Sequence, residues 1–338
     1  MTNRDGTGLS DITLWKPCEV CHKVQSLCTC RQTRAQGQVE LPAEQWSDPD
    51  EDAQNGREVL APGELVGQSY QIIRCLGTGG MSTVYLARSV NGDELVALKM
   101  LNASISLDEE ARLRFERETR AMKRLSHPNL LTLKDYGKTA EGQRYFVMDY
   151  LDGRSLDQEI AQLKAIEQNR ALHLFRQVCA GMKHAHEAGV VHRDLKPGNI
   201  FITQPPDQPD FVKVLDFGIA KLSCNVDDTE SNLTQKGQVL GSPRYMSPEQ
   251  CLGQTLDARS DIYSLGCVMY QAISGQTPFN GEHALAILYK QVNEAPHALG
   301  EMVPFGLSHR IESVVLKCLA KKREDRYQSM AELALALE

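Results

Sequence analysis

The sequence predicts an α+β fold of two lobes, in which a small β-rich lobe precedes a larger helical lobe. Short β-rich runs separated by turn residues begin at about Gly67, among them YQIIRCLG, STVYLAR, ELVALKML and YFVMDYL. Helical patterning interrupts them once, around residues 108–125, and dominates from about residue 167 onward. Strands followed by helices are typical of α+β folds, and two lobes imply a cleft between them.

The composition is that of an ordinary soluble protein, with 41% apolar and 24% charged residues among 338. The formal net charge of -7 argues against general binding to nucleic acids or anionic membranes, which usually leaves a basic footprint. No apolar stretch approaches the roughly 18 to 20 residues that cross a bilayer, and the first residues lack the apolar region of a signal peptide. We therefore expect a cytoplasmic protein with no membrane segment in this chain and no nucleic-acid partner.

A small cysteine-rich segment, residues 1–35, precedes the two lobes. Its sequence WKPCEVCHKVQSLCTC spaces four thiols as C-x2-C-x6-C-x-C, and four thiolates this close can form a tetrahedral Zn²⁺ site. A segment this small has no core of its own, so metal would have to fold it. Structural zinc is the leading hypothesis, with His22 as a substitute ligand, while redox or disulfide chemistry and an unstructured tail stay open. The expected ligands are Cys18, Cys21, Cys28 and Cys30.

An acidic linker is predicted for residues 36–66, because this stretch is polar and has no sustained period. The two-lobed domain is predicted to occupy residues 67–338. Single cysteines scattered through this domain, such as Cys179, Cys267 and Cys318, lie in apolar surroundings. In a reducing compartment such cysteines are best explained as small buried hydrophobic residues.

The first chemical motif of the domain is LGTGGMSTVYLA, in which Gly77 and Gly79 follow a predicted strand. Glycines at such a turn let backbone N–H groups approach a phosphate closely, because no Cβ stands in the way. Ser82 replaces the third glycine of GxGxxG, and a strand follows where a Rossmann unit would have a helix. Taken alone, the motif is equally compatible with a simple glycine-rich hairpin.

Lys99 is the sole charge in the apolar strand LVALKML, so its ammonium must pair with an anion in a cleft or reach solvent from an edge strand. The helix predicted around residues 108–125 offers a partner. Its Glu118 lies on the same inward stripe as Phe115 and Met122. We expect Lys99 and Glu118 to neutralise each other.

Two polar loops follow between apolar, strand-like runs, in VVHRDLKPGNIFI and VKVLDFGIAK. Asn199 and Asp216 offer hard oxygen ligands of the kind that Mg²⁺ takes alongside phosphate oxygens. Asp194 remains free to orient a hydroxyl group and accept its proton, and Lys196 can neutralise charge on a transferred group. This set suits phosphoryl transfer, which needs positioning and charge neutralisation more than covalent chemistry.

The motif order GTGGMSTV, VALK, a helical Glu, HRDLKPGN, DFG and SPEQ resembles the protein-kinase signature set. Phrases such as YFVMDYLDGRSL and YMSPEQ resemble the bacterial Hanks-type serine/threonine kinases in particular. The resemblance covers roughly residues 67–338 and implies a two-lobed protein-kinase fold, ATP with Mg²⁺ or Mn²⁺ as cofactors, and protein substrates. Lysine at position 196 implies Ser or Thr acceptors.

The resemblance also implies roles for individual residues. Asp194 is then the catalytic base, Asn199 and Asp216 hold the metal, and Lys99, paired with Glu118, holds the α- and β-phosphates. Lys196 completes the catalytic set. The expected ATP-binding residues, including Lys99 and a gatekeeper methionine, are Leu76, Gly77, Thr78, Gly79, Gly80, Met81, Ser82, Thr83, Val84, Ala97, Met148, Asp149 and Leu151. A structural ion pair and a loop anchor are expected from Glu249 with Arg326 and from Asp261.

The segment LTQKGQVLGS is expected to carry the regulatory phosphorylation. Phosphorylation would add about -1.5 to -2 charges near Arg193, the cation beside Asp194. Thr234 is the expected main autophosphorylation site, with Thr229 and Ser231 as weaker candidates, and a homodimer is one expected route to it. The alternative is that Thr234 is a loop hydroxyl of no consequence.

Two other function classes are compatible with such a fold. A pseudokinase scaffold would bind nucleotide or partners without transfer, but here all the polar catalytic positions are filled. A small-molecule or lipid kinase is disfavoured by SPRYMSPEQ, the segment that in protein kinases cradles the acceptor peptide. The sequence therefore favours an ATP-dependent serine/threonine protein kinase.

Overall fold

A computed structural model describes residues 59–79, 82–101, 116, 119–217, 242–300, 302–303 and 306–338. The chain divides into two units, Met1–Glu58 and Val59–Glu338, and all described residues belong to the second. This unit includes residues 59–66, which sequence analysis assigned to the end of the linker. The cysteine-rich segment and the rest of the linker lie outside the described residues.

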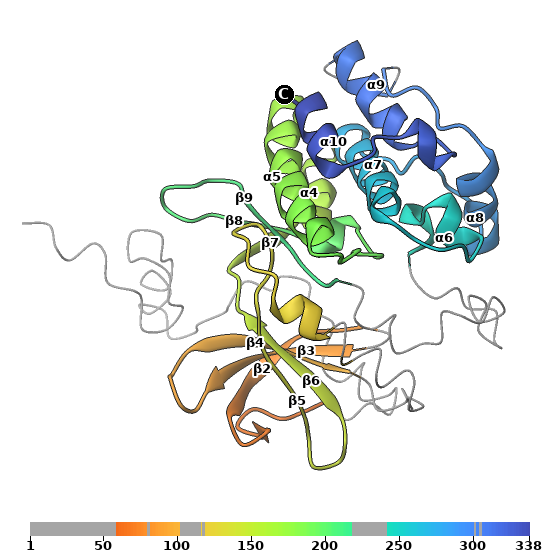
Figure 1. The fold of residues 1–338 in the computed structure, drawn as a ribbon. Helices are drawn as coiled ribbons and strands as arrows, with labels where there is room; N and C mark the ends of the chain where they lie inside the picture. Colours follow the sequence, from red (N-terminus) through yellow and green to blue (C-terminus); the bar gives the residue numbers. More distant parts are fainter. Residues whose placement is uncertain are drawn as a thin grey trace, which may run out of the picture. The chain divides into compact units, whose positions relative to one another are not determined.

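The small lobe contains a six-stranded antiparallel sheet with the strand order β1-β2-β3-β4-β6-β5 (Figure 1). The β-rich runs expected from the sequence form these strands. Their bounds are β1 (Leu65–Val66), β2 (Tyr70–Thr78), β3 (Ser82–Ser89), β4 (Leu95–Leu101), β5 (Leu133–Lys138) and β6 (Arg144–Asp149).

Side chains of β4 alternate between the two faces of this sheet, as the period of two in a strand requires. Val96, Leu98 and Met100 pack in the apolar cluster of the small lobe. Lys99 and Leu101 therefore turn to the opposite face, and Leu101 joins the main core of the large lobe. This alternation directs Lys99 toward the large lobe.

The large lobe is mostly helical (Figure 1, green to blue). Its α-helices are α4 (Leu156–Leu163), α5 (Gln168–Glu187), α6 (Pro248–Cys251), α7 (Ala258–Ser274), α8 (Ala284–Asn293), α9 (His309–Cys318) and α10 (Met330–Ala336). Short 3-10 turns cover Pro197–Asn199, Pro243–Tyr245 and Arg323–Asp325. A small sheet with the order β7-β8-β9 joins Gly153–Ser155, Ile200–Thr203 and Phe211–Val214.

Helix α7 forms the centre of the large lobe. All of its residues from Ser260 to Tyr270 are buried, which is the pattern of a helix surrounded by protein. The side chain of Asp257 caps its first turn, and Gly275 ends it with a φ of 78°. A Cβ at Gly275 would come within 2.4 Å of the Lys164 carbonyl oxygen, so only glycine fits this helix end.

Two sequence expectations about the core can be compared directly with the structure. Cys179, Cys267 and Cys318 are fully buried, free thiols, as expected. Of the helix predicted around residues 108–125, the described residues 116 and 119–123 are helical, and Met122 is buried. Residues 124 and 125 are described but lie beyond the end of the helix, and the other residues of the predicted helix lie outside the described residues.

Candidate active site

The sheet of the small lobe gathers four of the expected ATP-binding residues on one face. Ala97 lies directly opposite Met148 across the β4–β6 pair, and Val84 lies opposite Lys99 across the β3–β4 pair. Because Ala97 and Lys99 are two positions apart in β4, all four side chains share the face that is directed toward the large lobe. Met148 is buried, as a gatekeeper would be.

The glycine-rich motif joins β2 to β3. The Gly79 N–H donates to the Ser82 carbonyl oxygen over 2.8 Å, and Thr78 pairs with Thr83. The motif therefore forms a hairpin beside the face described above, with Gly80 and Met81 outside the described residues. The motif can therefore be both a hairpin and a phosphate-binding loop. Val84, just after the hairpin turn, pairs with Lys99, so the backbone of the motif lies next to that lysine.

Lys99 forms an ion pair across the two lobes. Its Nζ lies 2.7 Å from Oδ1 of Asp216, which follows β9. Lys99 is only 9% exposed, so the expectation that this buried charge needs an anionic partner is confirmed. The expected partner Glu118 lies outside the described residues, and the described partner is Asp216.

The loop between α5 and β8 brings Asp194, Lys196 and Asn199 together. The Lys196 Nζ lies 2.9 Å from Oδ2 of Asp194. The Asn199 Nδ2 donates to the Asp194 carbonyl oxygen over 2.8 Å and to its Oδ2 over 3.4 Å. Since the amide nitrogen of Asn199 faces Asp194, its amide oxygen remains available as a ligand.

His192 connects this loop to the one that carries Asp216, a role that sequence reasoning missed. Its Nε2 lies 2.7 Å from the Leu215 carbonyl oxygen, and its Nδ1 accepts from the Asp194 N–H over 3.2 Å. Burial lowers the pKa of His192, against the opposing effect of Asp261 and other nearby carboxylates. The ring therefore stays neutral, with Nε2 as donor and Nδ1 as acceptor. The sequence signal for a buried His192 was its position directly after the apolar residues Val190 and Val191.

Asp261, on α7, anchors the start of the loop that carries Asp194, Lys196 and Asn199, the proposed catalytic loop. Its carboxylate accepts the N–H groups of His192 and Arg193 over 2.8 and 2.9 Å, and Nε2 of His186 lies 2.8 Å away. Burial alone would raise the pKa of Asp261, but its hydrogen bonds with the His186 side chain and the His192 backbone help to outweigh burial, and that pKa is lowered. The predicted loop anchor is present.

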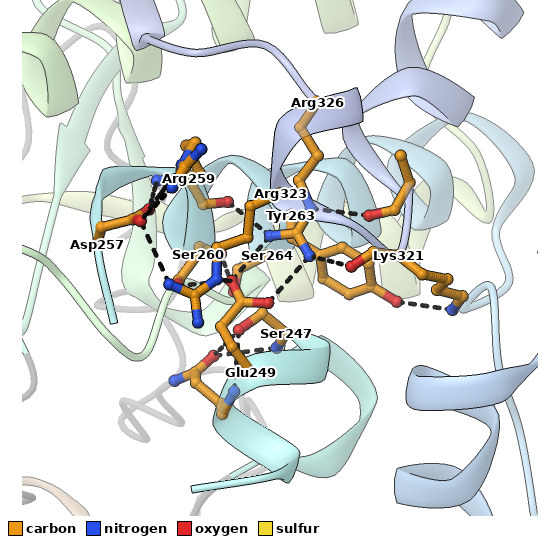
Figure 2. Close-up of polar contacts among 12 residues, drawn as sticks. Ser247, Glu249, Asp257, Arg259, Ser260, Tyr263, Ser264, Lys321, Arg323 and Arg326 are labelled. Atoms are coloured by element: carbon orange, nitrogen blue, oxygen red, sulfur yellow. Dashed lines mark hydrogen bonds and ion pairs between the residues drawn. The ribbon is translucent and has the colours of Figure 1, made fainter. Parts of the chain in front are cut away.

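The predicted ion pair of Glu249 with Arg326 is also present, deep in the large lobe (Figure 2). The guanidinium donates to both carboxylate oxygens, over 2.8 and 2.9 Å, and Ser260 donates a third hydrogen bond to Glu249. The next residue, Gln250, donates to the Arg193 carbonyl oxygen over 2.8 Å. This link between α6 and the catalytic loop was not anticipated, because a surface-type glutamine carries no positional signal.

The residues present fit a magnesium ion bound together with phosphate. Asn199 offers an amide oxygen, and Asp216 offers a carboxylate that is one-third exposed, so both are hard oxygen donors at the ends of adjacent strands. The Leu215 N–H donates to the Asn199 carbonyl oxygen over 2.8 Å, which holds the two donor residues beside one another. Of the predicted site residues, Gly80, Met81, Glu118, Thr234 and the four cysteines lie outside the described residues.

Comparison with known proteins agrees with this geometry. Residues 70–335 match the family described as the protein kinase domain. The chain is 38% identical over 265 residues to the serine/threonine-protein kinase pkn3 of Myxococcus xanthus, covering 78% of this chain and 48% of that protein. It is 39% identical over 272 residues to the serine/threonine-protein kinase PknB of Mycolicibacterium smegmatis, covering 78% of this chain and 41% of that protein.

The crystal structure of the Mycobacterium tuberculosis PknI kinase domain has a TM-score of 0.65 to this chain at 28% identity, covering 83% of this chain and 98% of that domain. The chain spans less than half the length of the two curated relatives. The shared part is the two-lobed unit that contains the site. The chain therefore belongs to the protein kinase family, and this unit is a serine/threonine protein kinase domain of the bacterial Hanks type.

Proposed function

We propose that the protein transfers the γ-phosphate of MgATP to Ser and Thr hydroxyl groups of other proteins and of itself. One observation carries this proposal. The Lys99–Asp216 ion pair of 2.7 Å lies across the lobes, and the loop with Asp194, Lys196 and Asn199 is hydrogen-bonded to the strand end that carries Asp216. Phosphoryl transfer needs this combination of phosphate-binding cation, metal-binding oxygens and carboxylate base.

Each residue then has a defined task. Lys99 binds the α- and β-phosphates, and Asn199 with Asp216 would hold the magnesium ion, which supplies charge neutralisation on the phosphate oxygens. Asp194 orients the acceptor hydroxyl and takes its proton as the new oxygen–phosphorus bond forms. The bond from the γ-phosphorus to the bridging oxygen breaks, and ADP leaves with its electron pair. Lys196, 2.9 Å from Asp194, offsets charge on the transferred group.

The test is autophosphorylation with labelled ATP, comparing wild type with Asp194→Asn. We expect the variant to lose at least about 100-fold in rate, because a positioned base contributes about 10²- to 10⁴-fold. Asp207→Asn changes an exposed carboxylate in the β8–β9 connection and is the matched control. If Asp194→Asn labels itself at the wild-type rate, the catalytic assignment is wrong. If wild type binds ATP but labels nothing, the pseudokinase alternative holds.

The proposal includes regulation by phosphorylation of Thr234, which lies outside the described residues. A phosphate on Thr234 would bring an anion to the side of the catalytic loop that carries Arg193. A homodimer, in which one copy modifies the other, is the proposed route. Mass-spectrometric mapping tests the site, since a fully active enzyme with an unmodified Thr234 contradicts it.

For the cysteine-rich residues 1–35, we retain the proposal of a structural zinc site that docks partners, joined to the kinase domain by an acidic linker from residue 36. Its support is the spacing of Cys18, Cys21, Cys28 and Cys30 alone. In the described ranges, no group of three or more His, Cys, Asp or Glu side chains is placed to hold a metal. Elemental analysis of the purified protein is decisive, because absence of stoichiometric zinc removes the proposal.

A cytoplasmic location is likewise a proposal. The described cysteines are free thiols, including the fully buried Cys179, Cys267 and Cys318, as in proteins of reducing compartments. None of the helices in the described part of the chain has the length and hydrophobicity to span a bilayer. Fractionation of cells with an antibody to this chain tests the location.

A further inference from the structure

The acceptor-binding segment, residues 242–247, rests on a buried glutamine. Gln291, in the last turn of α8, is 0% exposed and donates from Nε2 to the Pro243 carbonyl oxygen over 3.1 Å. The same segment is tied to α7, where Ser264 donates to the Tyr245 carbonyl oxygen over 2.8 Å. Gln291 and Ser264 therefore both help to fix the position of the backbone of residues 242–247, against which an acceptor peptide would lie.

Gln291 is in turn held by Tyr263 and Lys321. The Tyr263 hydroxyl donates to Gln291 Oε1 over 2.6 Å. The Lys321 Nζ donates to the Tyr263 hydroxyl oxygen over 3.1 Å, and Figure 2 shows this contact beside the ion pair of the large lobe. Lys321 also donates to the carbonyl oxygens of Gln291 over 2.7 Å and Lys290 over 3.3 Å, so it caps the end of α8.

The charge of Lys321 sets the direction of the hydrogen bonds at the Tyr263 hydroxyl. An ammonium group has three donors and no lone pair, so Tyr263 can only accept from it. The Tyr263 proton then points at Gln291, where Oε1 lies 2.6 Å and the carbonyl oxygen 3.4 Å from the hydroxyl oxygen. With its Oε1 held in this way, Gln291 donates from Nε2 to the Pro243 carbonyl, which can only accept. A neutral amine has a lone pair, which competes for the Tyr263 proton and releases Gln291 Oε1.

The buried environment of Lys321 favours loss of its proton. Burial lowers the pKa of Lys321 to about 8; Glu294 after α8 favours its charged form, and Arg326 opposes it. Its Nζ also lies 4.1 Å from the centre of the Phe279 ring.

The groups that face Lys321 keep their own protons in this range. Burial raises the pKa of Cys251 and Cys267 to about 12, and it raises that of Tyr263 well above its usual value. The change of hydrogen-bond direction above pH 8 therefore arises from Lys321.

We propose that Lys321 is a positioning residue for the protein substrate: its ammonium group orients Tyr263 and Gln291 and thereby fixes the acceptor-binding segment at Pro243. The inference rests on the proposed protein kinase function and concerns its acceptor side only. Lys99 and Asp216, which serve the nucleotide, have no contact with this network in the described hydrogen bonds and ion pairs.

Loss of the Lys321 proton should raise KM for the acceptor and leave KM for ATP unchanged. One hydrogen bond to the segment corresponds to roughly a fivefold change. We expect this rise in wild type as the pH passes through about 8.

The experiment measures KM for ATP and for a Ser/Thr peptide selected by wild type from a degenerate library, with the full chain, across that range of pH. Lys321→Arg keeps its charge, so its peptide KM should not rise above pH 8. Tyr263→Phe removes only the hydroxyl from a buried ring of the same shape, so its peptide KM should be high at every pH. Lys322→Met alters the exposed neighbour and should match wild type.

The outcomes separate this inference from the proposed function. If wild type phosphorylates no library peptide and does not label itself, the proposed function fails and the inference falls with it. If wild type is active but Lys321→Arg and Tyr263→Phe both keep the wild-type profile of peptide KM, only the role of Lys321 is wrong. A rise in KM for ATP that parallels the peptide effect also overturns it, because it indicates a general loss of structure.

Discussion

Two residues of the active site hold backbone conformations that side chains rarely adopt. Arg193 has a φ of 66° and Asp216 a φ of 51°. Such conformations cost on the order of 1 to 3 kcal/mol each and persist only where the surroundings enforce them. For Arg193, the Asp261 carboxylate holds the N–H at 2.9 Å. Arg193 precedes Asp194, the proposed base, and Asp216 is itself a proposed metal ligand, so these two conformations lie at the proposed catalytic groups.

The Glu249–Arg326 pair is expected to dominate the stability of the large lobe at the level of single residues. Both side chains are almost fully buried, at 2% and 0% exposure. Glu249→Gln leaves the guanidinium without a counter-charge, and we expect the free energy of unfolding to fall by about 3 kcal/mol. Urea unfolding followed by circular dichroism measures this loss. Glu187→Gln, which breaks an exposed pair with Lys183, should change it by less than about 0.5 kcal/mol.

The same pair gives a pH dependence of known sign. Burial would raise the pKa of Glu249, but its hydrogen bonds with Arg326 and Ser260 prevail and lower it from 4.5. A lowered folded-state pKa contributes stability that is complete above the unfolded value and is lost as the pH falls below it. Glu249→Gln should therefore lose less stability than wild type on acidification below about pH 4.5. Parallel acid-unfolding curves for the two proteins would contradict this assignment.

At the scale of elements, the sequence was most informative where a short β-rich run lies between turn residues. The run LVALKML predicts a strand, and β4 spans Leu95–Leu101 with Lys99 on the face opposite Val96 and Leu98. Loop contacts were not predictable in the same way. The hydrogen bonds of His192 and Gln250 join segments that are distant in the sequence, and no local pattern selects those partners.

Helix α7 should control the catalytic loop through one side chain. Oδ2 of Asp261 accepts from the His192 N–H and Oδ1 accepts from the Arg193 N–H. Asp261→Asn replaces one of these oxygens by an NH₂ group, which cannot accept, so one of the two backbone hydrogen bonds is lost. We expect kcat to fall about 100-fold, as for a displacement of catalytic groups by about 1 Å. His186→Gln removes only the histidine contact and leaves both backbone contacts, so its kcat should fall much less. Equal losses in the two variants would show that the loop is not anchored by these N–H groups.

At the scale of the whole molecule, the partner of Lys99 shows what a sequence leaves undecided. Spacing placed Glu118 on an inward stripe and predicted it as the partner of Lys99, and this pair stays a prediction because Glu118 lies outside the described residues. The contact of Lys99 with Asp216 at 2.7 Å was not predicted, because it depends on how the two lobes pack. The start of the folded unit likewise depends on packing. Residues 59–66 have the composition of a polar linker, but they contain β1, which pairs with β2.

Nucleotide binding should stabilise the folded domain as a whole, because the expected ligands come from both lobes. A ligand at about 100 times its Kd adds roughly 2.7 kcal/mol, which corresponds to a rise in Tm of about 5 °C or more for a domain of this size. We expect this rise with ATP and Mg²⁺, measured by differential scanning fluorimetry, and a smaller rise with ATP and a chelator.

Asp216→Asn removes a proposed metal ligand and the counter-charge of Lys99, which is only 9% exposed. The variant should start at a lower Tm, because its buried ammonium loses the charge of its described partner, and magnesium should add nothing to the effect of ATP. Asp207→Asn should behave as wild type does. A magnesium-dependent rise of wild-type size in Asp216→Asn would mean that the metal is held elsewhere, and the assignment of Asp216 would have to be abandoned.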